Sequence, residues 1–231
     1  MTSSGVSSIR IARLSPELAH LWLDPAVHVY VTAMHYPRGS ETSRVPLWRD
    51  HIARPDWVAY GAFATISALD SLRPTFSHLR VRPPLATGDR EVLIGVTYGY
   101  RGAPDQWWHR QLYSGLMRAG MAPAEAREYL RDYFELTELH VHPVAQGRGV
   151  GERLLTALLH DRSEAKVLLS TPEVPGEENR AWGLYRRLGF GDVLRYFNFV
   201  GDARPFAFLG RALPLGAPAA EDDVSSGTMR Q

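Results

Sequence analysis

The sequence contains no cysteine among its 231 residues. This absence excludes disulfide bonds, thiolate metal sites and a cysteine nucleophile. Lysine is nearly missing as well, since Lys166 is the single one and the other basic residues are arginines and histidines. We interpret this bias as that of a high-GC, bacterial coding sequence.

A strong charge of either sign and long apolar runs are also missing. The formal net charge is +1, which gives no field that would favour nucleic acid or a membrane surface as a partner. No apolar run approaches the ~20 residues of a membrane-spanning helix. The first nine residues lack the apolar core of a secretory signal. We therefore expect a cytoplasmic protein that binds neither nucleic acid nor membrane.

The hydrophobic residues make up 45% of the chain, which is enough for an ordinary core, and their spacing predicts alternating strands and helices. We expect strands at 8–14, 56–65, 91–100, 133–141, 166–170, 193–199 and 205–213. Expected helices cover 15–34 with a break at Pro25, 44–53, 150–161 and 179–190. The segments 56–65 and 91–100 are suited to antiparallel pairing. One mixed α/β domain over 8–213 and a disordered tail over 216–231 follow from this pattern.

The connection over residues 101–132 is far longer than the few residues that join most neighbouring elements. It contains Trp107 and Trp108, and helix formers follow Pro123. We interpret it as a helical insertion whose tryptophans cover the substrate cleft. The alternative is a contact between two copies of the chain, so a homodimer stays open.

The stretch "HPVAQGRGVGERLL" places three alternating glycines between a predicted strand and a predicted helix. A helix N-terminus offers free N–H groups and a partial positive charge. Gly147, Gly149 and Gly151 remove side chains that would block a phosphate, and Arg148 adds charge. The pattern therefore predicts an anion site, the alternative being a plain tight turn.

Two other phosphate motifs fit this turn less well. A Walker loop ends in Gly-Lys-Ser/Thr, whereas Glu152 and Arg153 follow the last glycine here. A dinucleotide fingerprint has the spacing G-x-G-x-x-G, and the turn has G-x-G-x-G. Glu173 lies at a distance along the chain that suits a ribose ligand, so this second interpretation stays open.

Two motifs resemble those of the GNAT superfamily of N-acetyltransferases. Its V-x-P and Gln/Arg-x-x-Gly-x-Gly/Ala pattern matches Val141, Pro143, Gln146, Gly149 and Gly151. Its N-x-x-A-x-x-L-Y-x-x-L-G-F pattern matches Asn179, Ala181, Leu184, Tyr185, Leu188, Gly189 and Phe190, with the Asn-to-Ala spacing one residue short. The resemblance is specific from Tyr133 to Phe190.

This resemblance implies a mixed, mostly antiparallel sheet of about six to seven strands with helices on both faces. It also implies acetyl-CoA as co-substrate, held through the pyrophosphate by the backbone of the turn and through the pantetheine arm by the strand before it. The acetyl thioester is then expected between that strand and the one at 166–170. The cofactor-binding residues so implied are Leu139, His140, Val141, Gln146, Gly147, Arg148, Gly149, Val150, Gly151 and Asn179.

The simplest chemistry without a cysteine, and without a G-x-S-x-G serine motif, is direct attack of an amine on the thioester. An alkyl amine with a pKa of ~10.4 is protonated at pH 7, and making it neutral costs about 4.6 kcal/mol. A base must therefore take a proton.

The strand "FELTELHV" supplies candidates for this base. Its apolar parity switches between Leu136 and Leu139, and a bulge near Thr137 would explain the switch. Three polar side chains then share one face, namely Glu135, Glu138 and His140. Either glutamate can act as the base. The alternatives are a solvated polar face for the glutamates and a packing role for His140.

Two residues of the second motif have roles that the resemblance implies. Tyr185 would donate a proton or hydrogen bond to the leaving thiolate, unless it is a core tyrosine. Asn179 would bind the pantetheine arm or only cap its helix. His140 and His142 also have strand spacing for zinc, but no third ligand is evident, so we expect no metal site.

The sequence thus predicts an acetyl-CoA-dependent N-acetyltransferase that acts on a small-molecule or peptide amine. The catalytic candidates are Glu135, Glu138 and Tyr185, and Trp107 and Trp108 are the candidates for acceptor binding. The alternative is a sensor of the same fold that binds acyl-CoA without turnover.

Overall fold

The computed structural model describes residues 9–65 and 91–215. Within these ranges the strands form one seven-stranded sheet in the order β1-β2-β3-β4-β5-β7-β6. They are β1 (Arg10–Leu14), β2 (Val58–Thr65), β3 (Glu91–Arg101), β4 (Tyr133–Val141), β5 (Lys166–Pro172), β6 (Gly191–Asn198) and β7 (Pro205–Ala212). Only β4 and β5 pair in parallel, and every other neighbouring pair is antiparallel. The predicted mixed, mostly antiparallel sheet is confirmed, as is the pairing of β2 with β3.

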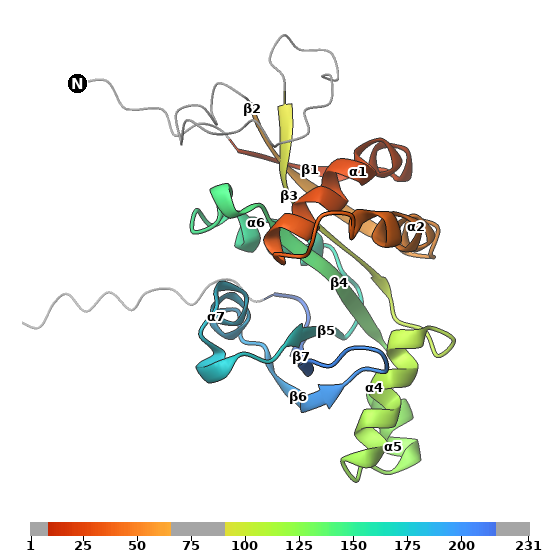
Figure 1. Ribbon diagram of the computed structural model, residues 1–231. Coiled ribbons are helices and arrows are strands. Elements are labelled where there is room, and N and C mark those ends of the chain that lie inside the picture. Colours follow the sequence, from red (N-terminus) through yellow and green to blue (C-terminus); the bar gives the residue numbers. More distant parts are fainter. Residues whose placement is uncertain (1–8, 66–90, 216–231) are drawn as a thin grey trace, which may run out of the picture.

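Helices cover both faces of this sheet (Figure 1). One face carries α1 (Pro16–Ala33), α2 (Glu41–Ile52), α4 (Trp107–Arg118) and α5 (Pro123–Tyr129). The other carries α6 (Val150–Leu159) and α7 (Arg180–Arg187). Two short 3-10 turns, η1 (Pro143–Ala145) and η2 (Pro175–Glu177), precede α6 and α7. The expected insertion over 101–132 thus folds as α4 and α5.

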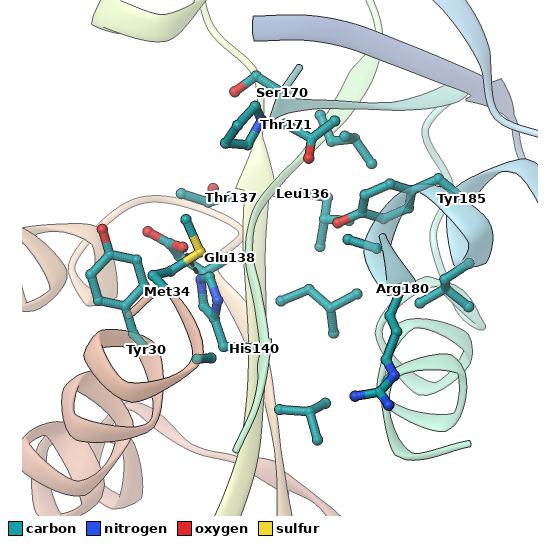
Figure 2. A pocket seen from close by; sticks show the side chains of 18 of the residues that line it. Tyr30, Met34, Leu136, Thr137, Glu138, His140, Ser170, Thr171, Arg180 and Tyr185 are labelled. Atoms are coloured by element: carbon teal, nitrogen blue, oxygen red, sulfur yellow. Dashed lines mark hydrogen bonds and ion pairs between the residues drawn. The ribbon is translucent and has the colours of Figure 1, made fainter. Parts of the chain in front are cut away.

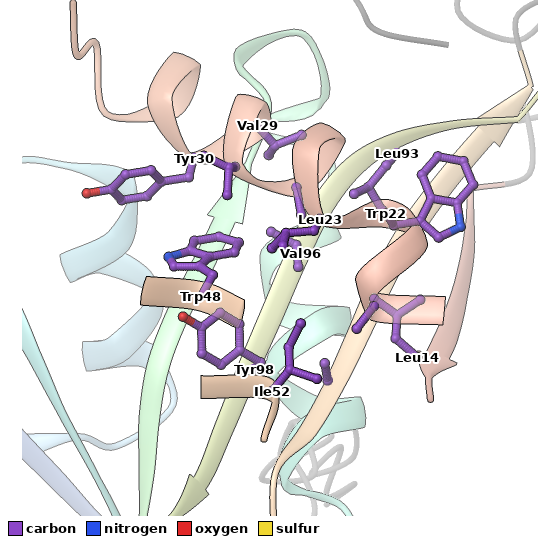
Figure 3. Packing of buried hydrophobic residues seen from close by; sticks show 14 of the residues in the cluster. Leu14, Trp22, Leu23, Val29, Tyr30, Trp48, Ile52, Leu93, Val96 and Tyr98 are labelled. Carbon is purple, nitrogen blue, oxygen red and sulfur yellow. The ribbon is translucent and has the colours of Figure 1, made fainter. Parts of the chain in front are cut away.

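Strand β3 shows how the two layers are built. Leu93 and Val96 face α1 and α2, where they join a cluster with Trp22 (Figure 3). Val92 and Ile94 face the opposite way and pack with α6. Because both faces of the strand are buried, its sequence is apolar almost throughout rather than alternating.

Helix α1 corrects the expected break at Pro25. The helix is continuous from Pro16 to Ala33, with Pro25 inside it and Ser15 as N-cap. An interior proline removes one hydrogen bond and costs about 3 kcal/mol. The buried residues on both sides of it, among them Trp22 and Val27, pack on the sheet. Burial of a large aromatic and several aliphatic side chains, each worth about 1.5–3 kcal/mol, exceeds that cost.

Strand β4 contains the feature that shapes the site. Tyr98 of β3 faces Glu138 and the next residue, Gly99, faces Leu136, so Thr137 is an extra residue in β4. The predicted bulge near Thr137 is confirmed. On its other edge β4 pairs with β5 only over Tyr133–Glu135. The remainder of β4 therefore runs on without β5 beside it.

The Pro/Gly/Arg-rich stretch between β2 and β3 and the tail over 216–231 lie outside the described residues. Among the helices that the structure does describe, none combines the length and the apolar character that crossing a bilayer requires.

Candidate active site

A cavity of about 800 Å³ lies where β4 and β5 diverge. Its size is that of a small-molecule site. One wall is formed by the glycine turn, the start of α6 and α7. The opposite wall is formed by α1, α2 and α4 with the loop between β6 and β7. Figure 2 shows β4 running between these walls, with Glu138 and His140 on the side of Tyr30 and with Tyr185 on the other side.

The glycine turn has the geometry that its sequence predicts. Gly147 and Gly149 have φ angles of 74° and 72°, a left-handed conformation that favours glycine. A Cβ on Gly149 would meet no atom within 4 Å, and this residue lines the cavity as the N-cap of α6. The free N–H groups of the first turn of α6 therefore border open space that a phosphate can enter.

Gln146 braces this turn from within. Its Nε2 donates to the backbone oxygen of Val141 over 2.9 Å, and its Oε1 accepts from Arg180 over 2.8 Å. The side chain of Gln146 thus has a structural role in addition to its place on the cavity wall. Two other predicted residues, Arg148 and Asn179, are not among the residues that line the cavity. The side chain of Asn179 accepts from Trp182 N over 2.9 Å and so caps α7.

Glu135 is the buried acid of the site, with only 2% of its surface exposed. Tyr100 donates to its Oε1 over 3.1 Å, whereas Oε2 is buried and has no partner among the described residues. Burial raises the pKa of Glu135 to about 7, against the lowering effects of the Tyr100 hydrogen bond and of Arg54. A carboxyl with a pKa near neutrality, on a residue that lines the cavity, has the properties of a general base.

Glu138 shares the face of Glu135, as the bulge predicts, but it has a different environment. Its Oε2 is hydrogen-bonded to Nε2 of His140. The His140 ring packs against Tyr30 at a centroid distance of 4.8 Å and stacks on Trp48 at 6.5 Å. Glu138 and His140 both line the cavity. In the described ranges, no three side chains of the metal-ligating kinds gather as a metal ion would need.

Tyr185 enters the cavity from α7, on the opposite side of β4 (Figure 2). Its ring is buried beside Phe190, and its hydroxyl has no hydrogen-bond partner within the described part of the chain. Burial, assisted by the charge of Glu138, raises the pKa of Tyr185. The hydroxyl therefore keeps its proton at neutral pH and can donate it to a group in the cavity.

The two tryptophans of α4 line the cavity but differ in their contacts. Trp107 is 48% exposed and stacks on Phe199 at a centroid distance of 5.2 Å. Trp108 packs on Phe208, and its Nε1 donates to Oγ of Ser170 over 3.0 Å. Trp108 therefore anchors α4 to the sheet, and Trp107 is the more exposed of the two on the cavity wall.

The sequence reasoning missed the whole wall contributed by the first hundred residues. Tyr30, Arg44, Arg54 and Tyr100 all line the cavity. Tyr30 and Tyr100 lie in runs that have the apolar pattern of ordinary core elements. One signal was present, since Arg44 lies in the predicted helix over 44–53, Arg54 directly follows it, and the same helix carries the buried Trp48.

Comparison with known proteins identifies the family. An acetyltransferase (GNAT) domain model matches residues 114–191. The GCN5-like protein acetyltransferase Rv2170 of Mycobacterium tuberculosis is 48% identical over 208 residues, which cover 90% of this chain and 100% of that protein. The chain therefore belongs to the GNAT acetyltransferases, and it is an acyltransferase.

Solved structures show the same fold at low sequence identity. An acetyltransferase from Thermus thermophilus is 14% identical with a TM-score of 0.51, over 91% of this chain and 100% of that one. Arabidopsis thaliana NAA60, solved in complex with acetyl-CoA, is 15% identical with a TM-score of 0.50, over 89% of this chain and 99% of that one.

The alternative of a dinucleotide site had assigned Glu173 to the ribose. In the structure, the carboxylate of Glu173 instead accepts two hydrogen bonds of 2.8 Å from Arg195.

Proposed function

We propose that this protein transfers the acetyl group of acetyl-CoA directly to a primary amine on a protein or peptide. The protein acceptor is suggested by the printed name of the 48% identical relative, a protein acetyltransferase. The observation that carries the proposal is Glu135, a residue that lines the cavity and whose buried carboxyl has a pKa of about 7 and one oxygen without a partner in the described chain.

The residues present fit a CoA thioester. The open space at Gly149 and the start of α6 suit the pyrophosphate. The stretch of β4 after Glu135, which has no β5 beside it, offers backbone groups to the pantetheine arm. When bound, acetyl-CoA supplies an activated acyl group whose thiolate has a pKa near ~8.5 and leaves readily.

In this proposal Glu135 accepts a proton from the acceptor amine, and the nitrogen lone pair then attacks the thioester carbonyl. The carbon–nitrogen bond forms, the carbon–sulfur bond breaks, and Tyr185 gives its proton or a hydrogen bond to the departing sulfur. Tyr100 holds the carboxyl through Oε1. The second oxygen, Oε2, is thereby left for the amine. Trp107 and Trp108 shield the reacting groups from water and contact the acceptor.

A turnover assay with acetyl-CoA and a panel of lysine peptides, free N-terminal amines and small amines tests this proposal. Because the chain has no cysteine, a thiol reagent detects only the CoA that the reaction releases. We expect CoA release matched one to one by acetylated peptide in mass spectra. Tight CoA binding without turnover on any amine would instead support the acyl-CoA sensor.

A further inference from the structure

The wall of the cavity opposite the glycine turn contains two arginines that form no ion pair within the described chain. Arg44 and Arg54 both line the cavity and are half-buried. In the ranges that the structure describes, neither has a carboxylate within ion-pair distance or a side-chain hydrogen bond. The third arginine of this wall, Arg204, differs from them because it is bound to Asp202 through contacts of 2.6 and 3.0 Å.

Each of the two free guanidinium groups lies over an aromatic ring. The Arg54 guanidinium lies 4.5 Å from the centre of the Tyr100 ring, and that of Arg44 lies 5.5 Å from the centre of the Tyr30 ring. Stacking engages the face of a guanidinium and leaves its N–H groups at the edge unused. A guanidinium held in this way is prepared to bind a carboxylate with two parallel hydrogen bonds.

Among the described residues, no carboxylate on this side of the cavity lies within ion-pair distance of Arg44 or Arg54. Glu135 accepts from Tyr100, Glu138 is bonded to His140, and Asp202 is bound by Arg204. Anions that pair with Arg44 and Arg54 therefore have to come from a molecule in the cavity. Since the ring under Arg54 also holds Glu135, the anion at Arg54 lies close to the acceptor amine.

We propose, resting on the function above, that the acceptor carries carboxylates near its amine, and that Arg54 binds one of them and Arg44 another. For a peptide, these are aspartates or glutamates within a few residues of the acceptor lysine, because one extended residue spans about 3.3–3.6 Å. The arginines act on acceptor choice, and the CoA side of the cavity is independent of them.

Paired peptides test this inference. Each pair has one acceptor lysine, flanked at two positions on either side by glutamate in one peptide and by the isosteric glutamine in the other. We expect kcat/KM to be at least about tenfold higher for the glutamate peptide, mainly through KM, since charge-assisted hydrogen bonds are worth that much. Arg44→Gln and Arg54→Gln, made separately, should each reduce the ratio, and the double variant should bring it to about twofold or less.

Arg49→Gln is the matched control, because Arg49 is exposed on the same helix and does not line the cavity. The Arg49→Gln variant should keep the full preference for the glutamate peptide over the glutamine peptide. Melting curves check that each variant is folded. If one of the two single variants is unfolded, the peptide ratio of the other still tests the inference. Equal use of both peptides by the unaltered enzyme overturns the inference, as does a double variant that keeps the full ratio.

Failure here is distinguishable from failure of the proposed function. Equal acetylation of the glutamate and glutamine peptides agrees with the proposed acetyltransferase activity and contradicts carboxylate binding by the arginines. If no peptide is acetylated, calorimetry with CoA-loaded enzyme and the same peptides still measures the site. If the enzyme binds the glutamate peptide and Arg54→Gln does not, the result supports carboxylate binding by the arginines. Equal binding of both peptides by the unaltered enzyme contradicts it.

Discussion

The wall on the glycine-turn side is made by two contiguous stretches, 145–152 and 180–187, whereas the facing wall draws side chains from α1, α2, β3 and α4. The first stretch of the glycine-turn wall offers backbone N–H groups and left-handed glycines. The facing wall offers rings, arginines and carboxyls, each placed by a different element. Backbone recognition leaves a contiguous motif in the sequence, and side-chain recognition assembled by folding does not.

The largest effect should come from the loss of Glu135. Glu135→Gln removes the proposed base and should lower kcat by roughly 10²–10⁴-fold, with CoA affinity nearly unchanged. In the unaltered enzyme kcat should rise with pH through about 7, because the carboxylate form accumulates above the raised pKa. This limb should vanish in the variant.

Glu138→Gln is the control for that experiment, since it lies on the same face and its carboxylate is already bonded to His140. It should keep the rise near pH 7. The reverse pattern, a silent Glu135→Gln and a flattened Glu138→Gln profile, would transfer the role of base to Glu138.

Tyr185→Phe tests the other side of β4. Loss of a hydrogen bond to a charged group should lower kcat roughly 10–100-fold. The loss should be similar at every pH up to about 9, because burial raises the pKa of Tyr185 above its usual value of ~10 and keeps the hydroxyl protonated. Tyr129→Phe, a partly buried tyrosine that does not line the cavity, should leave kcat unchanged. An unaltered kcat in Tyr185→Phe would make Tyr185 a packing residue.

Gly149→Val tests backbone recognition. A β-branched side chain in a left-handed conformation would occupy the open space at the start of α6. We expect CoA affinity to fall at least tenfold, which is about 1.4 kcal/mol, as measured by calorimetry. Gly120→Val is the matched control, because Gly120 also has a positive φ and open space around it and does not line the cavity. Equal CoA affinity in both folded variants would contradict the phosphate assignment.

The smallest effect should come from the loss of Trp107. Trp107→Ala should raise the acceptor KM about three- to tenfold and leave acetyl-CoA binding nearly intact. Trp107 is the better choice because Trp108 also anchors α4 through Ser170. If Trp107→Ala instead converts a dimer into monomers in sedimentation and keeps KM, the tryptophan belongs to a contact between copies.

The two walls also differ in how far sequence could predict them. The turn and the bulge at Thr137 were predictable, because left-handed glycines and a parity switch are local signals. Tyr100 and Arg54 were not, since their meeting with Glu135 depends on the pairing of β3 with β4 and on how α2 packs. The continuity of α1 through Pro25 was missed for the same reason: burial on the sheet outweighs a local penalty.

The short pairing between β4 and β5 has a consequence for how the molecule unfolds. Three residue pairs join the half of the sheet made by β1 to β4 with the half made by β5, β7 and β6. Such halves can open as separate cooperative units, which amide hydrogen exchange detects. A ligand that spans the gap and binds only the closed form raises the free energy of opening by about 2.7 kcal/mol when its concentration is a hundred times its Kd. Occupancy should then merge the two units into one, so that the slow exchange of β3 extends to β5 and β7.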